Sequence, residues 1–375
     1  MPNRVTPRRV TLEIRVSCSP GELRAAAVRD GTLLDYAITR PGAPDGVGDR
    51  LRGRTMAHLP AMAGAFIALP DGPDGFLPDS QGAHGLNDGD PVTVLVTRAA
   101  QGGKGPRLTA RTPQAGPGAP ELLARGPGAI ERLQALHPGA IVFVDDPAAA
   151  TPGATPNFTI VRQAWDEALE TAIAALSEPI LDLPGGLRAS IHPTPALVAI
   201  DVDTAAASAE RRTKAGAQRE ANRAALPALA HALRVRNLSG AIVLDLAGMT
   251  AKARTALAPD LAAALAPDPL HPRFLGFTAL GLAEILRSRI HPPLHELLSG
   301  PHAAGLRALR HLARQAAADP ATPLRLRTAP DVARALDADT AARTDLARRT
   351  GRPLVVLTEP AYPPGRWTLE PLPRG

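Results

Sequence analysis

Cysteine is nearly absent from this chain of 375 residues, which contains only Cys18. A single cysteine excludes a framework of intramolecular disulfides and a zinc site built from several cysteines of one chain. This composition is typical of proteins in a reducing compartment, so we expect a cytoplasmic location. The stretch from Met1 to Val16 is too poor in apolar residues for a signal peptide, and no apolar run approaches a membrane span. We therefore expect a soluble protein with no membrane partner.

Aromatic residues are also scarce, at 3% of the chain, so each one carries more weight in an argument about ligand contacts. Acids are outnumbered by lysine and arginine, and the formal net charge of +6 favours a polyanionic partner such as nucleic acid. No glycine-rich loop ends in Gly-Lys-Ser/Thr, which leaves nucleoside triphosphate binding without support. The length predicts two or three domains.

The spacing of apolar residues predicts a chain of mixed architecture. Short strands separated by Gly, Pro and Asp between residues 46 and 112 indicate a small β-barrel. Helical periodicity predicts helices at 160–177, at 211–234 with a kink or break at Pro227, and at 279–289. Helices and strands alternate in the last seventy or so residues, which is typical of a small α/β unit.

Two aspartates each follow a short apolar run that reads as a buried strand. Asp201 follows residues 196–200, and Asp245 follows residues 241–244. Carboxylates delivered to one edge of a sheet are suitable ligands for Mg²⁺, which prefers hard oxygen donors. The alternative is that each acid caps its strand and faces water, and these runs alone favour neither interpretation.

The predicted barrel contains two phenylalanines and nearby basic residues. Phe66 and Phe76, with Lys104, are the components needed to stack bases and bind phosphates of a single strand. The alternative is that both rings belong to the core of the barrel.

The order of motifs along the chain resembles the ribonuclease E/G family. The S1 domain of that family is resembled by residues 48–54, 63–68, 75–78 and 102–109. Its DNase I-like catalytic part is resembled by residues 183–186, 195–203, 232–245 and 281–289.

This resemblance implies an α+β multidomain fold. An RNase H-like subdomain, residues 1–45 and 115–182, would be interrupted by an S1 (OB-fold) barrel at 46–112. A DNase I-like α/β catalytic subdomain would follow at 183–298, and a small C-terminal α/β domain at 302–375.

The resemblance also implies an activity, which is endonucleolytic cleavage of single-stranded RNA by metal-assisted phosphodiester hydrolysis in RNA processing or decay. The expected ligands of Mg²⁺, or of Mn²⁺, are Asp201 and Asp245, and Asp203 is the third expected catalytic residue. The expected RNA-binding residues are Phe66, Phe76, Lys104, Arg107 and Arg234.

Several departures from the family pattern qualify these expectations. Asp203 stands where the family usually has Asn, Gly248 replaces an acid, and residues 209–213 replace a Gly-Gly-Asp stretch. The Val-Arg-Thr-Ala segment that senses a 5′ monophosphate and the Cys-Pro-x-Cys zinc link have no counterpart. We therefore expect no zinc, no 5′-monophosphate sensing, and a monomer or a zinc-independent homodimer.

Two further functions stay open at this stage. The missing acid at Gly248 favours a catalytically weak or inactive RNA-binding regulator of the same family. A DNA nuclease is a third and weaker interpretation, based on the DNase-like architecture.

Overall fold

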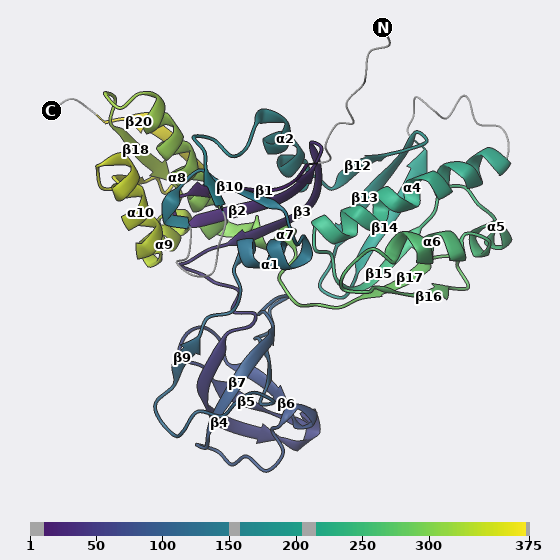
Figure 1. Cartoon of the computed structure of the whole chain (residues 1–375), viewed down its shortest axis with the longest axis horizontal. Coiled ribbons are helices and arrows are strands. Elements are labelled where there is room, and N and C mark those ends of the chain that lie inside the picture. The colour runs from purple at the N-terminus through teal and green to yellow at the C-terminus, as the bar shows by residue number, and fades with distance from the viewer. Residues whose placement is uncertain (1–10, 150–157, 205–214, 373–375) are drawn as a thin grey trace, which may run out of the picture. The chain divides into compact units, whose positions relative to one another are not determined.

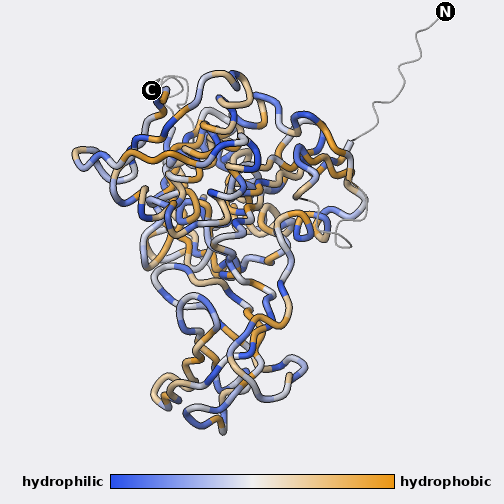
Figure 2. Tube along the Cα trace, turned by 90° about the vertical axis from the view of Figure 1, so that its left-hand side faces the viewer, coloured by the Kyte–Doolittle hydropathy of each residue, from blue (hydrophilic) through white to orange (hydrophobic). Residues whose placement is uncertain are grey.

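The computed structural model describes residues 11–149, 158–204 and 215–372. Residues 209–213, which stand in place of the Gly-Gly-Asp stretch, lie outside the described residues. The chain forms two compact units. One comprises residues 1–44, 127–173 and 297–375, and the other residues 45–126 and 174–296. Figure 1 shows the elements of each unit, and Figure 2 shows that hydrophobic and hydrophilic residues interleave along the trace. No helix in the described ranges has the length and apolar character needed to cross a membrane.

The first unit contains a five-stranded sheet with the order β11-β10-β1-β2-β3. Its strands are β1 (Leu12–Ser19), β2 (Glu22–Arg29), β3 (Thr32–Thr39), β10 (Ile141–Val144) and β11 (Phe158–Ile160). β1, β2 and β3 form antiparallel hairpins, whereas β10 and β11 run parallel to β1. Asp30 and Gly31 both have positive φ, which suits the tight hairpin between β2 and β3. Helices α1 (Ala129–Leu136) and α2 (Glu167–Ala175) accompany this sheet.

A second, smaller sheet of the same unit has the order β19-β18-β20. Its strands are β18 (Leu324–Thr328), β19 (Val356–Thr358) and β20 (Trp367–Pro371), and its helices are α8 (Gly300–Ala318), α9 (Pro330–Ala338) and α10 (Thr340–Thr350). Buried leucines of the three helices pack with Leu326 of β18 into one apolar core. The alternation of helices and strands expected for this region is confirmed.

The second unit contains a closed barrel, as the sequence predicts. Its strands are β4 (Arg50–Leu59), β5 (Gly64–Ala68), β6 (Gly75–Pro78), β7 (Pro91–Arg98) and β8 (Arg107–Thr109), and β9 (Glu121–Ala124) pairs with the outside edge of β4. The order β5-β6-β8-β7-β4 closes because β5 also pairs with β4. Gly53 lies so close to Ile67 that a Cβ there would be 2.4 Å from its side chain, so the tight wall of the barrel requires glycine at this position.

The other sheet of this unit has six strands in the order β12-β13-β14-β15-β17-β16. These are β12 (Ile180–Leu183), β13 (Leu187–Pro193), β14 (Val198–Thr204), β15 (Gly240–Asp245), β16 (Arg273–Phe277) and β17 (Ala283–Arg287). The helices of this part are α4 (Ala215–Val235), α5 (Ala251–Thr255), α6 (Ala258–Leu265) and α7 (Leu294–Leu297). Apolar residues of α4 and α6 pack against one face of the sheet to form its core, so the side chains of the opposite face are the more exposed ones.

One predicted helix is shorter than expected, and another is wrong. The helix expected at 160–177 begins only at Glu167, because β11 pairs with β10 and Asp166 caps the helix by accepting a 2.8 Å hydrogen bond from the Leu169 backbone. The segment at 279–289 contains β17 instead of a helix. Pairing with β15 and β16 outweighs its helical propensity, and its side chains alternate between buried and exposed.

Pro227 lies inside α4, which continues through it, so of the kink or break expected there the break is wrong, and the kink stays a prediction. The mixed α+β class is confirmed. The RNase H-like and DNase I-like descriptions and the boundaries of the four subdomains stay predictions.

Candidate functional site

The two aspartates singled out in the sequence lie side by side. Asp201 of β14 is the direct register partner of Asp245 of β15 in a parallel pair, so the two backbones are about 4.8 Å apart. Ile200 and Leu244 face the helices, and the alternation of strands therefore turns both carboxylates to the open face of the sheet. Asp203, two residues further along β14, projects from the same face and is exposed. Three carboxylates thus gather on one open sheet face.

Negative charge accumulates around Asp201. Partial burial raises the pKa of the Asp201 carboxyl, and the charges of Asp203 and Asp245 raise it further. Like charges at this spacing oppose ionisation of one another, and a bound cation would relieve that repulsion. The geometry therefore suits a positively charged ligand.

Arg254 already supplies one positive charge to this group. Its Nη1 donates to Oδ1 of Asp245 at 2.5 Å and to the carbonyl oxygen of Gly281 at 2.9 Å, and its Nε donates to the carbonyl of Met249 at 3.2 Å. These contacts hold a guanidinium group whose side chain is only 13% exposed. Arg254 could not be singled out from the sequence, because an arginine nine positions after Asp245 gives no pattern that places it against the carboxylate.

Asn222 fixes the chain that follows Asp245. Its side chain is fully buried, donates to the carbonyl oxygen of Ala247 at 3.0 Å and accepts from the Ala247 amide at 3.1 Å. Gln218 donates to the same carbonyl at 3.2 Å. Both residues lie on α4, so this helix determines the path of the chain through Gly248, whose φ is +53°. The segment that lacks the expected acid is therefore held in a defined conformation.

The carboxylates by themselves make a small donor set. Within residues 11–149, 158–204 and 215–372, no group of three or more His, Cys, Asp or Glu side chains is arranged to hold a metal ion. Asp201 and Asp245 can still offer two hard oxygen ligands on adjacent strands, and a magnesium ion commonly takes its other ligands from water and phosphate. The residues present fit such an ion through two protein ligands.

The phenylalanines of the barrel form an outward-facing pair. Phe66 of β5 and Phe76 of β6 are register partners, with ring centroids 5.6 Å apart and ring planes at 62°. Their strand neighbours Ala65, Ile67 and Leu77 fill the core of the barrel, whereas both phenylalanines are half-buried and lie outside that core. The interpretation of the two rings as core residues is therefore not supported.

Basic residues adjoin this aromatic pair. Arg107 of β8 is the register partner of Phe76 and is exposed, which extends the row across a third strand. Lys104 is exposed in the turn before β8, where its backbone bridges to Gln101. An aromatic row with an arginine at its end and a lysine in the preceding turn is typical of a single-strand binding surface.

Arg234 lies apart from both groups. It is near the end of α4, in a groove that α4 forms with α6 and Pro267, and its guanidinium donates to the Pro267 carbonyl at 3.1 Å. Since α4 covers the opposite face of the sheet from Asp201, the structure does not bring Arg234 to the carboxylates.

Comparison with known proteins identifies the segment that carries the carboxylates. Residues 163–290 match the ribonuclease E/G family. Ribonuclease G of Haemophilus influenzae is 33% identical over 131 residues, which are 35% of this chain and 26% of that protein. Ribonuclease E of a Nostoc species is 32% identical over 134 residues, 34% of this chain and 19% of that protein. The similar segments thus span about a quarter or less of these relatives. The segment 163–290, which contains Asp201 and Asp245, is thus similar to the ribonuclease E/G family.

Proposed function

We propose that this protein is a metal-dependent endoribonuclease that cleaves single-stranded RNA. The observation that carries the proposal is the direct pairing of Asp201 with Asp245 on the open face of the sheet. The pair lies within the segment that matches a family of ribonucleases.

Asp201 and Asp245 would hold Mg²⁺, for which Mn²⁺ is a substitute. The ion, when bound, polarises the scissile phosphodiester and lowers the pKa of a coordinated water. Arg254 donates a hydrogen bond to Oδ1 of Asp245, so the Oδ2 atom of Asp245 is the one available to a metal ion. Asp203 adds negative charge beside Asp201, which favours a cation at this position.

The aromatic pair would bind the RNA strand. Phe66 and Phe76 offer apolar ring surface outside the core of the barrel, and Arg107 and Lys104 offer positive charge for phosphates. Bases of a duplex are stacked on one another and cannot offer their faces to these rings, so the preferred RNA is single-stranded.

The remaining features of the proposal come from the departures in the sequence. Cleavage proceeds without sensing a 5′ monophosphate and without a structural zinc ion, and the protein acts as a monomer or a zinc-independent homodimer. Its setting is RNA processing or decay in the cytoplasm.

A cleavage assay tests this function directly. Purified protein is mixed with single-stranded RNA that carries either a 5′ phosphate or a 5′ hydroxyl, in Mg²⁺, in Mn²⁺ or in EDTA. We expect internal cleavage at equal rates on both RNAs, none in EDTA, and slower cleavage of an RNA duplex. A strong preference for 5′-phosphorylated RNA would contradict the absence of a sensor, and cleavage in EDTA would contradict the metal site.

The contact of Arg254 with Asp245 gives a specific reason to consider a second function. A guanidinium group on the proposed metal ligand, next to the missing acid at Gly248, favours an RNA-binding regulator with weak or no catalysis. Tight RNA binding without cleavage in either metal would establish this alternative. Competition between single-stranded DNA and RNA tests the weaker possibility of a DNA nuclease.

Phe66→Ala is expected to weaken RNA binding without affecting folding. A base stacked on an aromatic ring contributes about 1–3 kcal/mol, so the dissociation constant for a short single-stranded RNA should rise about tenfold. Fluorescence anisotropy measures this change. Met62→Ala is the matched control, since Met62 is an exposed apolar residue of the same barrel. Equal affinities of the Phe66 and Met62 variants would exclude the aromatic pair from the binding surface.

A further inference from the structure

A cavity of about 810 Å³ lies within the first unit, away from the carboxylates of β14 and β15. Ser17 and Ser19 at the carboxyl end of β1 line it, as does Asp145, which directly follows the parallel strand β10. Arg310 and Arg314 of α8 form another part of the wall. The crevice beyond the carboxyl ends of parallel strands is a common place for ligands, and this volume is in the range of small-molecule sites.

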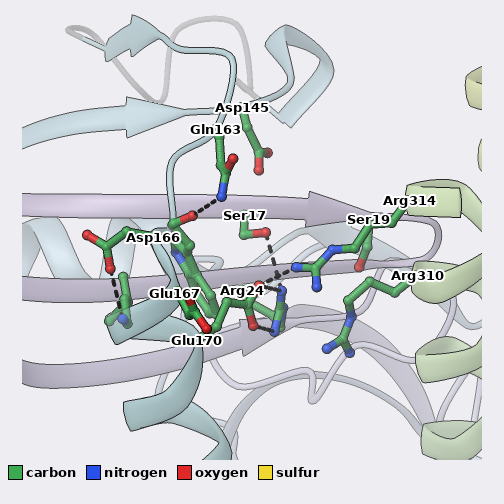
Figure 3. Close-up of polar contacts among 12 residues, drawn as sticks. Ser17, Ser19, Arg24, Asp145, Gln163, Asp166, Glu167, Glu170, Arg310 and Arg314 are labelled. Atoms are coloured by element: carbon green, nitrogen blue, oxygen red, sulfur yellow. Dashed lines mark hydrogen bonds and ion pairs between the residues drawn. The ribbon is translucent and has the colours of Figure 1, made fainter. Parts of the chain in front are cut away.

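The ion pairs beside this cavity are unbalanced. Glu22, whose side chain is 1% exposed, contacts Arg40 at 2.9 Å and Arg310 at 2.8 Å. Glu170 contacts Arg24 at 3.3 Å and also pairs with Arg314. Figure 3 shows the side chains of Arg310 and Arg314 extending from α8 toward Arg24 and Glu170. Four guanidinium groups therefore share two carboxylates, and a positive charge excess remains in a largely buried network.

Two of these arginines also have unused hydrogen-bond capacity. The Nε atoms of Arg24 and Arg310 are buried and have no acceptor among the described residues. Burial lowers the pKa of Arg310, and the nearby charge of Arg24 lowers it further. An anion in the cavity, beside Arg310 and Arg314, would offset the charge excess.

Acids as well as arginines line the wall of this cavity. Asp145 accepts a 2.7 Å hydrogen bond from the Cys18 amide, so its carboxylate is already engaged with β1. Glu167 and Arg162, both exposed on the wall, carry opposite charges. Arg314 has a side chain that is 54% exposed, so it is the accessible cation of the network.

We propose that this cavity binds a small phosphate-bearing molecule, with the phosphate held by Arg310 and Arg314, which both line it. The forked donors of arginine match the several acceptor oxygens of a phosphate group. The cavity is larger than a phosphate ion, so the ligand carries an organic part up to the size of a nucleotide. That part is not recognised by base stacking on Trp165, because the Trp165 ring is 2% exposed and Arg24 lies over it at 4.2 Å. This site is independent of the proposed cleavage of RNA.

Titration calorimetry and thermal unfolding of the full chain test the proposal. The probes are inorganic phosphate and ribose 5-phosphate, with ribose as the neutral control, all at the same ionic strength. We expect saturable binding of both phosphates, a rise in melting temperature with their concentration, and tighter binding of ribose 5-phosphate. Ribose should not bind.

Variants assign the binding to the cavity. Arg314→Ala should weaken binding of ribose 5-phosphate about tenfold, as expected for loss of a charge-assisted hydrogen bond. Arg343→Ala is the matched control, because Arg343 is an exposed arginine of the same unit that pairs with Asp337. If Arg314→Ala unfolds, Arg314→Gln replaces it. No saturable binding of either phosphate, binding of ribose as tight as that of ribose 5-phosphate, or equal effects of the Arg314 and Arg343 substitutions would overturn the proposal.

Discussion

Asp245→Asn is expected to abolish RNA cleavage while RNA binding stays close to that of the wild type. The substitution removes one of the two carboxylates that face each other across β14 and β15, and an amide is a much poorer ligand for Mg²⁺. Loss of outer-shell partners alone typically costs about 10–100-fold in metal affinity or activity, so loss of a ligand should lower the cleavage rate by about a hundredfold or more. The aromatic pair of the barrel is unchanged, so affinity for RNA persists.

The rate of cleavage and the affinity for RNA are measured on the same preparations. Asp182→Asn is the matched control, because Asp182 is an exposed aspartate on β12, at the edge of the same sheet. Circular dichroism shows whether each variant folds. Cleavage by the Asp245 variant at the rate of the Asp182 variant would rule out the proposed metal site.

Glu22→Gln is expected to destabilise the first unit severely. Glu22 forms ion pairs with Arg40 and Arg310. Loss of its charge would leave these guanidinium groups without their buried counter-charge. Removal of one partner from a buried pair typically costs about 3–5 kcal/mol of unfolding free energy. The effect should exceed that of any exposed acid.

The same residue should make the unit sensitive to acid. Burial alone would raise the pKa of Glu22, but the guanidinium groups of Arg310, Arg40 and Arg24 outweigh burial and lower it below the usual value of 4.5. Because the folded state depresses this pKa, ionised Glu22 contributes stability above pH 4.5, and the contribution is lost as the pH falls through the folded pKa. The wild type should therefore lose stability on acidification, and Glu22→Gln should lose less.

Tryptophan fluorescence reports on this unit selectively. The chain has two tryptophans, Trp165 and Trp367, and both belong to the first unit. Urea unfolding followed by their emission at pH 7 and at pH 4 gives the two comparisons. Asp337→Asn is the control, since Asp337 is an exposed acid of the same unit. A Glu22 variant as stable as this control would show that the buried network contributes little to folding.

The sequence predicted the parts of the site that depend on local pattern. Short apolar runs placed Asp201 and Asp245 on strands, and the register of β14 with β15 brings them together. The orientation of Phe66 and Phe76 could not be predicted, because it depends on which residues of β5 and β6 face the barrel core. A strand pattern alone does not identify its inner face.

Contacts between residues far apart in the chain could not be predicted from the sequence. Arg254, which donates to Asp245, also donates to the carbonyl of Gly281 27 positions away, in a turn that a helix at 279–289 would have removed. β17 forms because it pairs with β15 and β16. Buried Arg287, at the end of β17, pairs with Asp268 at 2.7 Å. Helical propensity in this segment carries no information on either partner.

The first unit is built from three separate segments of the chain, so its parts are synthesised at different times. The hydrogen bond of Arg310 with Glu22 joins residues 288 positions apart. A ribosome adds about 5–20 residues per second, so roughly 15–60 s separate the emergence of the two partners. During that interval β1 lacks its later neighbour β10, and buried Glu22 lacks its counter-charge from α8. The nascent first segment therefore stays without these partners until the last part of the chain has been made.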